Sequence, residues 1–256
     1  MNSSKKSILN SNFTYLAAFV LPVIMMMALY YTRGIFPWGN ECYLRSDMYH
    51  QYAPFFSELW HKIRNGESLT YSWNIGMGTN FTSLFAYYLA SPSNWFVALF
   101  PQKYTIEIMN AFIILKIAGS SLSLTYYLTK HNNNKHVIAA IFGMFYGMSG
   151  FIAAYSWNIM WLDCVILVPL IMLGLERLVN ENKCLLYCIS LGLCIFTNYY
   201  IAIMVCMAVV LYFIVLMVSY NGTRHPRIYL KKFIHWCVYS LLAGGLSACL
   251  LLPELY

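Results

Sequence analysis

The sequence predicts an all-α fold, a polytopic transmembrane helix bundle with about seven spans and with interfacial helices in a large first outer loop. Sixty per cent of the 256 residues are hydrophobic and ten per cent are charged, and the mean hydropathy is +0.59. Chains of this composition bury much of their apolar surface in lipid. The apolar residues also fall into separate runs, most of them long enough for a helix to cross the bilayer.

The first run, residues 13–32, carries no charge and can cross the ~30 Å hydrocarbon layer at about 1.5 Å per residue. A cleaved signal peptide is the alternative interpretation. It is disfavoured because the run is longer than the apolar region of a signal and ends in Tyr30-Tyr31-Thr32-Arg33, without the small residues of a cleavage site.

Six further runs predict six more spans between residues 106 and 252. They cover residues 106–129, 137–155, 164–179, 184–198, 201–219 and 233–252. Another hydrophobic run, residues 81–100, is interrupted by Ser91-Pro92-Ser93-Asn94. If it crossed the membrane, most of the later Lys and Arg residues would lie outside, against the positive-inside rule. We therefore expect this run to be interfacial or re-entrant on the outer face, with the N-terminus in the cytoplasm.

The net charge of +7 does not indicate a nucleic-acid partner. Most Lys and Arg residues flank predicted spans on the cytoplasmic side, where such residues orient a membrane protein in the bilayer. All cysteines except Cys42 fall within predicted spans, where a thiol behaves as a small apolar group. The sequence therefore predicts neither a disulfide framework nor a zinc site.

The outer loop, residues 33–105, contains the first group of candidate site residues: Arg45, Asp47, His50 and Gln51. Apolar residues recur at helical spacing over residues 47–64 and predict an amphipathic helix along the membrane surface, with Pro54 as a kink or restart. Asp47 lies where this helix begins. Its carboxylate either caps the helix or contributes to a reactive site with His50 and Gln51, which share its face.

A second group of candidates lies deeper in the predicted bundle. Asp163 follows the outer turn that contains Asn158, and the spans around it are short, which predicts a carboxylate at the floor of a cavity. A helix-start Asp that interacts with the helix dipole is the alternative. Lys116 lies near the middle of a span, where an ammonium costs on the order of 3 kcal/mol, so we expect it to pair with a lipid-linked phosphate or with Asp163. An ion pair without function is the alternative.

A third group combines aromatic and amide side chains. Residues 71–80 contain Trp73, Asn74 and Asn80, and a later outer turn contains Tyr199. Such residues are suited to binding sugars, although interfacial anchoring uses the same residue types. The sequence contains no phosphate-binding loop, no Gly-x-Ser-x-Gly elbow and no His-Glu-x-x-His motif, so cytosolic nucleotide chemistry has no support.

These segments together resemble the YfhO family of bacterial membrane proteins. The residues that carry the resemblance are Ser46 to Tyr52, Tyr71 to Phe81, Tyr88 to Asn94, Lys116, Asn158 to Asp163, Pro169 to Ile171, Gly174 to Arg177 and Asn198 to Tyr200. The resemblance covers nearly the whole chain. Family members are longer than 256 residues, which suggests that residues 1–256 are the N-terminal part of a transmembrane domain similar to GT-C glycosyltransferases.

The resemblance implies the transfer of a monosaccharide from a polyprenyl-phosphate donor to a cell-wall polymer such as lipoteichoic acid, outside the bacterial cytoplasmic membrane. Asp47 matches the essential acidic residue in the first outer loop and would act as general base. Lys116 or Arg45 would neutralise the leaving phosphate, and Asp163 would orient the acceptor or the base. No cofactor is implied, although Asp47 and Asp163 could hold a divalent ion. A flippase or transporter of a lipid-linked sugar and a noncatalytic scaffold are the alternatives.

Overall fold

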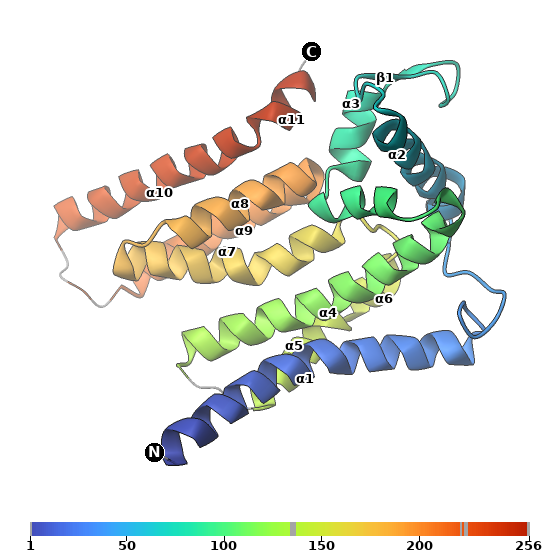
Figure 1. The fold of residues 1–256 in the computed structure, drawn as a ribbon. Coiled ribbons are helices and arrows are strands. Elements are labelled where there is room, and N and C mark those ends of the chain that lie inside the picture. Colours follow the sequence, from blue (N-terminus) through green and yellow to red (C-terminus); the bar gives the residue numbers. More distant parts are fainter. Residues whose placement is uncertain (1, 134–136, 221, 223–224, 255–256) are drawn as a thin grey trace.

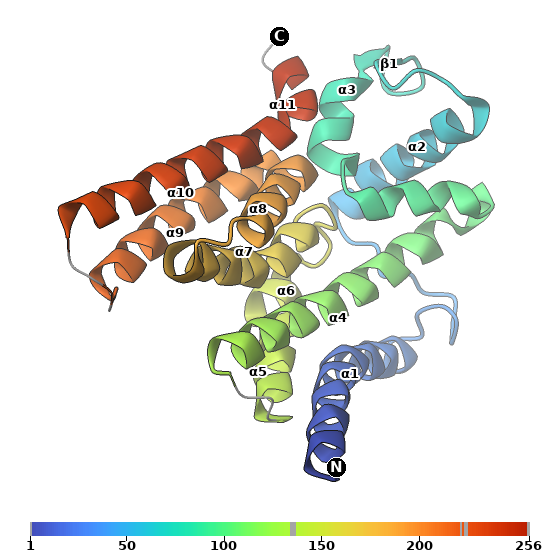
Figure 2. The same cartoon turned by 60° about the vertical axis from the view of Figure 1, so that its left-hand side comes forward.

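The computed structural model describes residues 2–133, 137–220, 222 and 225–254. Its long helices run along one another as a bundle, and the segment between the first and second long helices gathers at one end (Figure 1). We call this end the loop end. Both views place α4 between α1 and α7 (Figures 1 and 2), so α4 is the central helix of the half that carries the candidate site.

Helices occupy all seven predicted spans. The bundle consists of α1 (Asn2–Thr32), α4 (Thr105–His131), α5 (Val137–Gly147), α6 (Gly150–Tyr155), α7 (Leu162–Glu181), α8 (Leu185–Thr197), α9 (Tyr199–Val218), α10 (Pro226–Leu246) and α11 (Ala248–Glu254). Two predicted spans are each broken into two helices, α5 with α6 and α10 with α11.

Four stretches are long and apolar enough to cross a membrane: Asn12–Thr32, Gln102–His131, Val137–Tyr155 and Tyr199–Val218. The predicted all-α membrane helix bundle is thereby confirmed. The number of spans stays a prediction for the helices outside these four stretches, since α8 is short and both α7 and α10 carry several charged residues.

Small residues let the helices of the bundle approach closely. A Cβ atom added to Gly174 of α7 would lie 2.5 Å from the backbone nitrogen of Tyr187 in α8, and one added to Gly143 of α5 would lie 2.4 Å from the carbonyl oxygen of Ser121 in α4. Backbone contacts of this kind are typical of helices that pack in lipid, where van der Waals contact replaces the hydrophobic effect. They fix α7 against α8 and α5 against α4.

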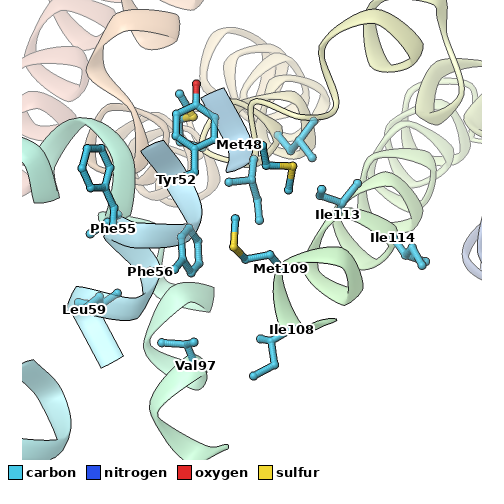
Figure 3. Packing of buried hydrophobic residues seen from close by; sticks show 14 of the residues in the cluster. Met48, Tyr52, Phe55, Phe56, Leu59, Val97, Ile108, Met109, Ile113 and Ile114 are labelled. Atoms are coloured by element: carbon cyan, nitrogen blue, oxygen red, sulfur yellow. The ribbon is translucent and has the colours of Figure 1, made fainter. Parts of the chain in front are cut away.

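The loop segment begins with η1 (Met48–Tyr52) and α2 (Ala53–Asn65). Their apolar residues face inward, where Met48, Phe56 and Leu59 are fully buried and Phe56 packs toward Met109 of α4 (Figure 3). The amphipathic helix predicted over residues 47–64 is confirmed. Pro54 lies in the first turn of α2, where its missing N–H costs nothing, so it marks a restart of the helix.

The rest of the loop segment forms a small hairpin and a dip into the bundle. It contains β1 (Tyr71–Ser72), β2 (Thr79–Asn80), α3 (Phe81–Leu84), η2 (Phe85–Leu89), η3 (Pro92–Leu99) and η4 (Gln102–Tyr104). Ser91, between η2 and η3, is 3.4 Å from the Lys116 ammonium. Lys116 lies eleven positions after Thr105, the first residue of α4, or about 17 Å along the helix axis. Residues 81–100 therefore contact a side chain from the middle of α4 through Ser91, and the re-entrant or interfacial position of this segment in the membrane stays a prediction.

A polar cluster ties three helices together at the end opposite the loop end. The Glu176 carboxylate of α7 accepts hydrogen bonds from the hydroxyls of Tyr127 in α4 (2.8 Å) and Tyr212 in α9 (2.5 Å), and it lies 2.9 Å from His131 Nδ1, also in α4. Glu176 is buried. A buried carboxylate needs several donors, and this one obtains them from side chains on two other helices.

Candidate functional site

Lys116 and Asp163 form an ion pair inside the bundle. The Lys116 Nζ atom lies 2.6 Å from Asp163 Oδ2, and the two side chains are only 5% and 14% exposed. The ammonium also donates to the carbonyl oxygen of Ile159 (3.2 Å) and to the hydroxyl of Ser91 (3.4 Å). An ammonium has three N–H donors. The Asp163 carboxylate, the Ile159 carbonyl and the Ser91 hydroxyl accept one hydrogen bond each and so use all three. Of the two anions expected for Lys116, the structure contains the carboxylate.

The turn between α6 and α7, residues 156–161, connects this pair to the loop segment. Its Asn158 accepts a hydrogen bond at Oδ1 from the Tyr52 hydroxyl (2.9 Å), and its Ser156 hydroxyl lies 2.6 Å from that of Tyr43. The next peptide along supplies the Ile159 carbonyl that Lys116 binds. The Nδ2 group of Asn158 is buried and has no hydrogen-bond partner among the described residues. A donor of this kind is available for an oxygen atom of a ligand or of a water molecule.

Tyr52 is the contact through which η1 reaches the turn. Its ring stacks on Trp157, with the centroids 6.2 Å apart, and packs against Tyr88, whose hydroxyl accepts a hydrogen bond from Gln51 (3.0 Å). Burial raises the pKa of Tyr52 above its ordinary value, and the nearby Asp47 charge raises it further. Tyr52 therefore stays neutral and keeps its proton in the bond to Asn158.

Asp47 is exposed and directly precedes η1. Its side chain makes no capping hydrogen bond, so the interpretation of Asp47 as a helix cap is wrong. The physical reason is its backbone conformation: with φ −61° and ψ −18° Asp47 is already helical, whereas a capping residue is extended and turns its side chain back toward the free N–H groups. Ser46 before it has φ 48° and makes the reversal of the chain.

The predicted site residues fall into three sets, of which the hairpin residues are the third. Asn158, Lys116 and Asp163 contact one another through the turn, and Gln51 joins them through Tyr88 and Tyr52. Asp47, His50 and Arg45 are exposed on the segment that leads to Tyr52. Tyr199 lies at the edge of the set that contains Asn158 and Gln51, where the Tyr199 ring contacts that of Tyr87 with the centroids 5.7 Å apart.

The amides of the hairpin belong to a separate structural cluster. Asn74 donates to the carboxylate of Glu58 (3.0 Å), and Asn80 accepts from two backbone N–H groups and caps α3. Trp73 is 77% exposed and touches only the edge of Tyr71 among the described ring contacts. Of the three hairpin residues expected to bind sugar, Trp73 is the one whose side chain is mostly exposed and makes no hydrogen bond among the described residues.

Glu58 and Lys62 of α2 hold the hairpin by hydrogen bonds. Glu58 accepts from Ser72 (2.6 Å) and Asn74, and Lys62 donates to the carbonyl oxygens of Ser68 and Tyr71. Burial disfavours the charged form of Glu58, but the hydrogen bonds from Ser72 and Asn74 and the charge of Lys62 outweigh burial and lower the pKa of this carboxyl. Glu58 and Lys62 were not expected from the sequence, since an i, i+4 acid–base pair is more often an exposed one.

Tyr52, Tyr88 and Ser91 are the contact residues that sequence reasoning missed. Tyr52 was assigned to the apolar face of the amphipathic helix, which is correct for its ring but overlooks its hydroxyl. Ser91 counted only as an interruption of a hydrophobic run. Its position next to proline in an otherwise apolar segment was the one available signal, because a polar turn at membrane depth must face protein or a cavity.

The divalent ion considered for Asp47 and Asp163 has no supporting geometry. Asp163 is bound to Lys116, and within the described ranges no group of three or more His, Cys, Asp or Glu side chains could hold a metal ion. Neither carboxylate lines the cavity between α1, α4 and α6.

A family model described as "bacterial membrane protein YfhO" matches residues 17–256, which include every residue of the site. The chain belongs to the YfhO family. Comparisons with curated proteins and with solved structures give no match. Together with the four long apolar helices, membership in the YfhO family identifies the chain as a bacterial membrane protein.

Proposed function

We propose that this YfhO-family protein is a GT-C-like glycosyltransferase, which moves a monosaccharide from a polyprenyl-phosphate donor to a cell-wall polymer such as lipoteichoic acid. The observation that best supports the proposal is the position of Asp47. It is an exposed carboxylate with no hydrogen bond or ion pair among the described residues, at the loop end of an apolar bundle. A free carboxylate at a lipid–water boundary can take a proton from a hydroxyl whose partner substrate is dissolved in the membrane.

Asp47 would act as the general base. The acceptor hydroxyl gives its proton to the Asp47 carboxylate while its oxygen forms a bond to the anomeric carbon of the sugar. The bond from that carbon to the phosphate oxygen breaks, and polyprenyl phosphate leaves with the electron pair. The segment around Asp47 is held for this role, because the next residue, Met48, is fully buried and Tyr52 is bonded to Asn158.

Asp163 and Lys116 would act as positioning residues. The pair fixes the turn that contains Asn158, and Asn158 in turn holds Tyr52, four positions along η1 from Met48. Loss of the pair is expected to disturb Asp47 only through this chain of contacts. His50 and Gln51 would contact substrate from the same face as Asp47, and the exposed Trp73 would stack on a sugar of the acceptor.

The loop end would face the extracytoplasmic side. Of the described Lys and Arg residues, five lie at the loop end and eight lie toward the opposite end of the bundle, namely Lys5, Lys6, Lys130, Arg177, Lys183, Arg227, Lys231 and Lys232. An excess of cations at one end of a bundle is retained in the cytoplasm during insertion. The donor would therefore have to carry its sugar on the outer leaflet.

Replacing Asp47 by Asn in the full-length protein tests the proposal. A general base contributes roughly a factor of 10² to 10⁴ to the rate, so we expect sugar transfer to the wall polymer to fall at least about a hundredfold while the protein still folds and inserts. Glu41→Gln is the matched control, an exposed acid in the same loop. Transfer by Asp47→Asn near the wild-type rate would exclude the general-base role. Wild-type protein that moves the lipid-linked sugar across vesicles without transferring it would favour the flippase.

A further inference from the structure

A cavity of about 180 Å³ lies near the loop end, between α1, α4 and α6. One side of its lining is apolar and comes from the helices, and the other side is polar and comes from the loop segment and the turn after α6. The lining residues are Met26, Leu29, Ile117, Gly147, Met148, Ile152 and Ala153 on the apolar side and Tyr43, Arg45 and Ser156 on the polar side. A cavity with this division suits an amphiphilic ligand.

The charge of the polar side is a single cation. Arg45 is exposed, and its guanidinium has no hydrogen bond or ion pair among the described residues. The hydroxyls of Tyr43 and Ser156 bond to each other at 2.6 Å, and none of the described residues that line the cavity is an acid. Tyr30, which stacks on Tyr43 with ring centroids 5.5 Å apart, has a buried hydroxyl without a hydrogen-bond partner in the described part of the chain. A guanidinium without a protein anion is ready to bind a phosphate through two parallel hydrogen bonds.

The apolar side reaches the surface of the bundle. Leu29 in α1 is 42% exposed, and Ala153 in α6 is also exposed. Their neighbours Met25 and Phe151 are exposed as well. A hydrocarbon chain in the membrane can therefore enter between α1 and α6 from the side, without passing through water.

We infer that this cavity binds the phosphate end of a single-chain prenyl phosphate, with the phosphate on Arg45 and the first isoprene units among Met26, Leu29 and Ile152. The inference rests on the proposed function and deepens it, because it assigns the phosphate of the donor to Arg45 and leaves Lys116 to Asp163. A single chain is favoured because the cavity is smaller than the roughly 300 Å³ at which sites for drug-sized ligands begin. Asp47, two positions after Arg45, then lies next to the bond that breaks.

A binding experiment on the purified full-length protein tests this site without any need for catalysis. The probe is geranylgeranyl phosphate, measured by native mass spectrometry, with geranylgeraniol as the same chain without phosphate. We expect the phosphate to bind at least about tenfold more tightly than the alcohol, and Arg45→Gln to remove that difference. Arg33→Gln is the matched control, since Arg33 is an exposed arginine of the same loop that does not line the cavity.

A second pair of variants tests the apolar side. Ala153→Phe fills the cavity from an exposed position and should weaken binding at least about tenfold, whereas Ala154→Phe, exposed but outside the lining, should not. Equal binding of phosphate and alcohol, or unchanged binding by Arg45→Gln, would overturn the inference. So would displacement of the probe by an equal concentration of phosphatidylglycerol, which would identify a phospholipid site.

The two proposals can fail separately. Asp47→Asn should bind the probe like the wild type, because Asp47 does not line the cavity. Specific binding by a wild-type protein that transfers no sugar would uphold the cavity and refute the transferase. Transfer that survives Arg45→Gln, in a protein that no longer distinguishes the phosphate from the alcohol, would uphold the transferase and place the donor elsewhere.

Discussion

Replacing Lys116 by Met removes the cation of the buried ion pair and leaves the Asp163 carboxylate without it. The side chains are 5% and 14% exposed, so water cannot replace the ammonium. Removing one partner of such a pair costs roughly 3–5 kcal/mol, because the remaining charge is buried and uncompensated. We expect Lys116→Met to lower the free energy of unfolding by about that amount.

The double variant Lys116→Met, Asp163→Leu distinguishes the cost of an unpaired buried carboxylate from the cost of the hydrogen bonds that Lys116 no longer donates. Both charges are then gone, and what remains is the loss of the donor to the Ile159 carbonyl and the Ser91 hydroxyl. Each lost hydrogen bond is worth about 1 kcal/mol. The double variant should therefore be about 1–2 kcal/mol less stable than the wild type, and more stable than the single variant.

The assay is denaturant unfolding of the purified full-length protein in detergent, followed by helical circular dichroism and by tryptophan fluorescence. Trp157, one of the seven tryptophans, stacks on Tyr52 in the turn next to the pair and contributes to that signal. A Lys116→Met protein within about 1 kcal/mol of the wild type would refute the reasoning, as would a double variant as unstable as the single one. Either result would mean that the pair is more hydrated than its burial indicates.

Two further predictions concern the hairpin and the helix packing. The pKa of Glu58 is lower in the folded protein than its ordinary value of 4.5, so its stabilisation is present above about pH 4.5 and is lost as the pH falls through the lower, folded-state pKa. Limited proteolysis of residues 66–80 should therefore speed up in acid for the wild type and be fast already at neutral pH for Glu58→Gln; a pH-independent rate in the wild type would contradict this. Gly174→Ala should cost about 1–3 kcal/mol, because its Cβ would meet the backbone of Tyr187 at 2.5 Å, whereas Gly244→Ala, where no atom of the described residues lies within 4 Å of the added Cβ, should gain roughly 0.5–1 kcal/mol. Equal thermal unfolding midpoints for the two alanine variants would show that α7 and α8 are not in backbone contact.

Helix positions could be predicted from the sequence because hydrophobic length and periodicity act locally. Each predicted span contains a helix, and the amphipathic pattern over residues 47–64 correctly gives the buried face of η1 and α2. The need of Lys116 for an anion could be predicted as well, since the cost of a buried ammonium does not depend on the details of packing.

Contacts between distant segments could not be predicted in the same way. Tyr52 and Asn158 are 106 positions apart, and nothing in either local pattern indicates that their polar atoms meet. The capping role of Asp47 failed for a different reason, because the chain reverses one residue before it, at Ser46 with its left-handed φ of 48°, and leaves Asp47 itself in a helical conformation. Backbone reversals of this kind are set by the whole loop, which the helix-start signal does not include.

The two buried carboxylates of α7 also fix how this helix can move. Asp163 binds Lys116 and Glu176 binds His131, and these partners lie thirteen positions apart on α7 and fifteen on α4, or about 20 Å along both axes. The two helices are therefore parallel and pinned at two levels. A sliding motion of one helical turn, about 5.4 Å, would separate both pairs at once. We therefore expect α4 and α7 to move together as one rigid body in any conformational change of the protein.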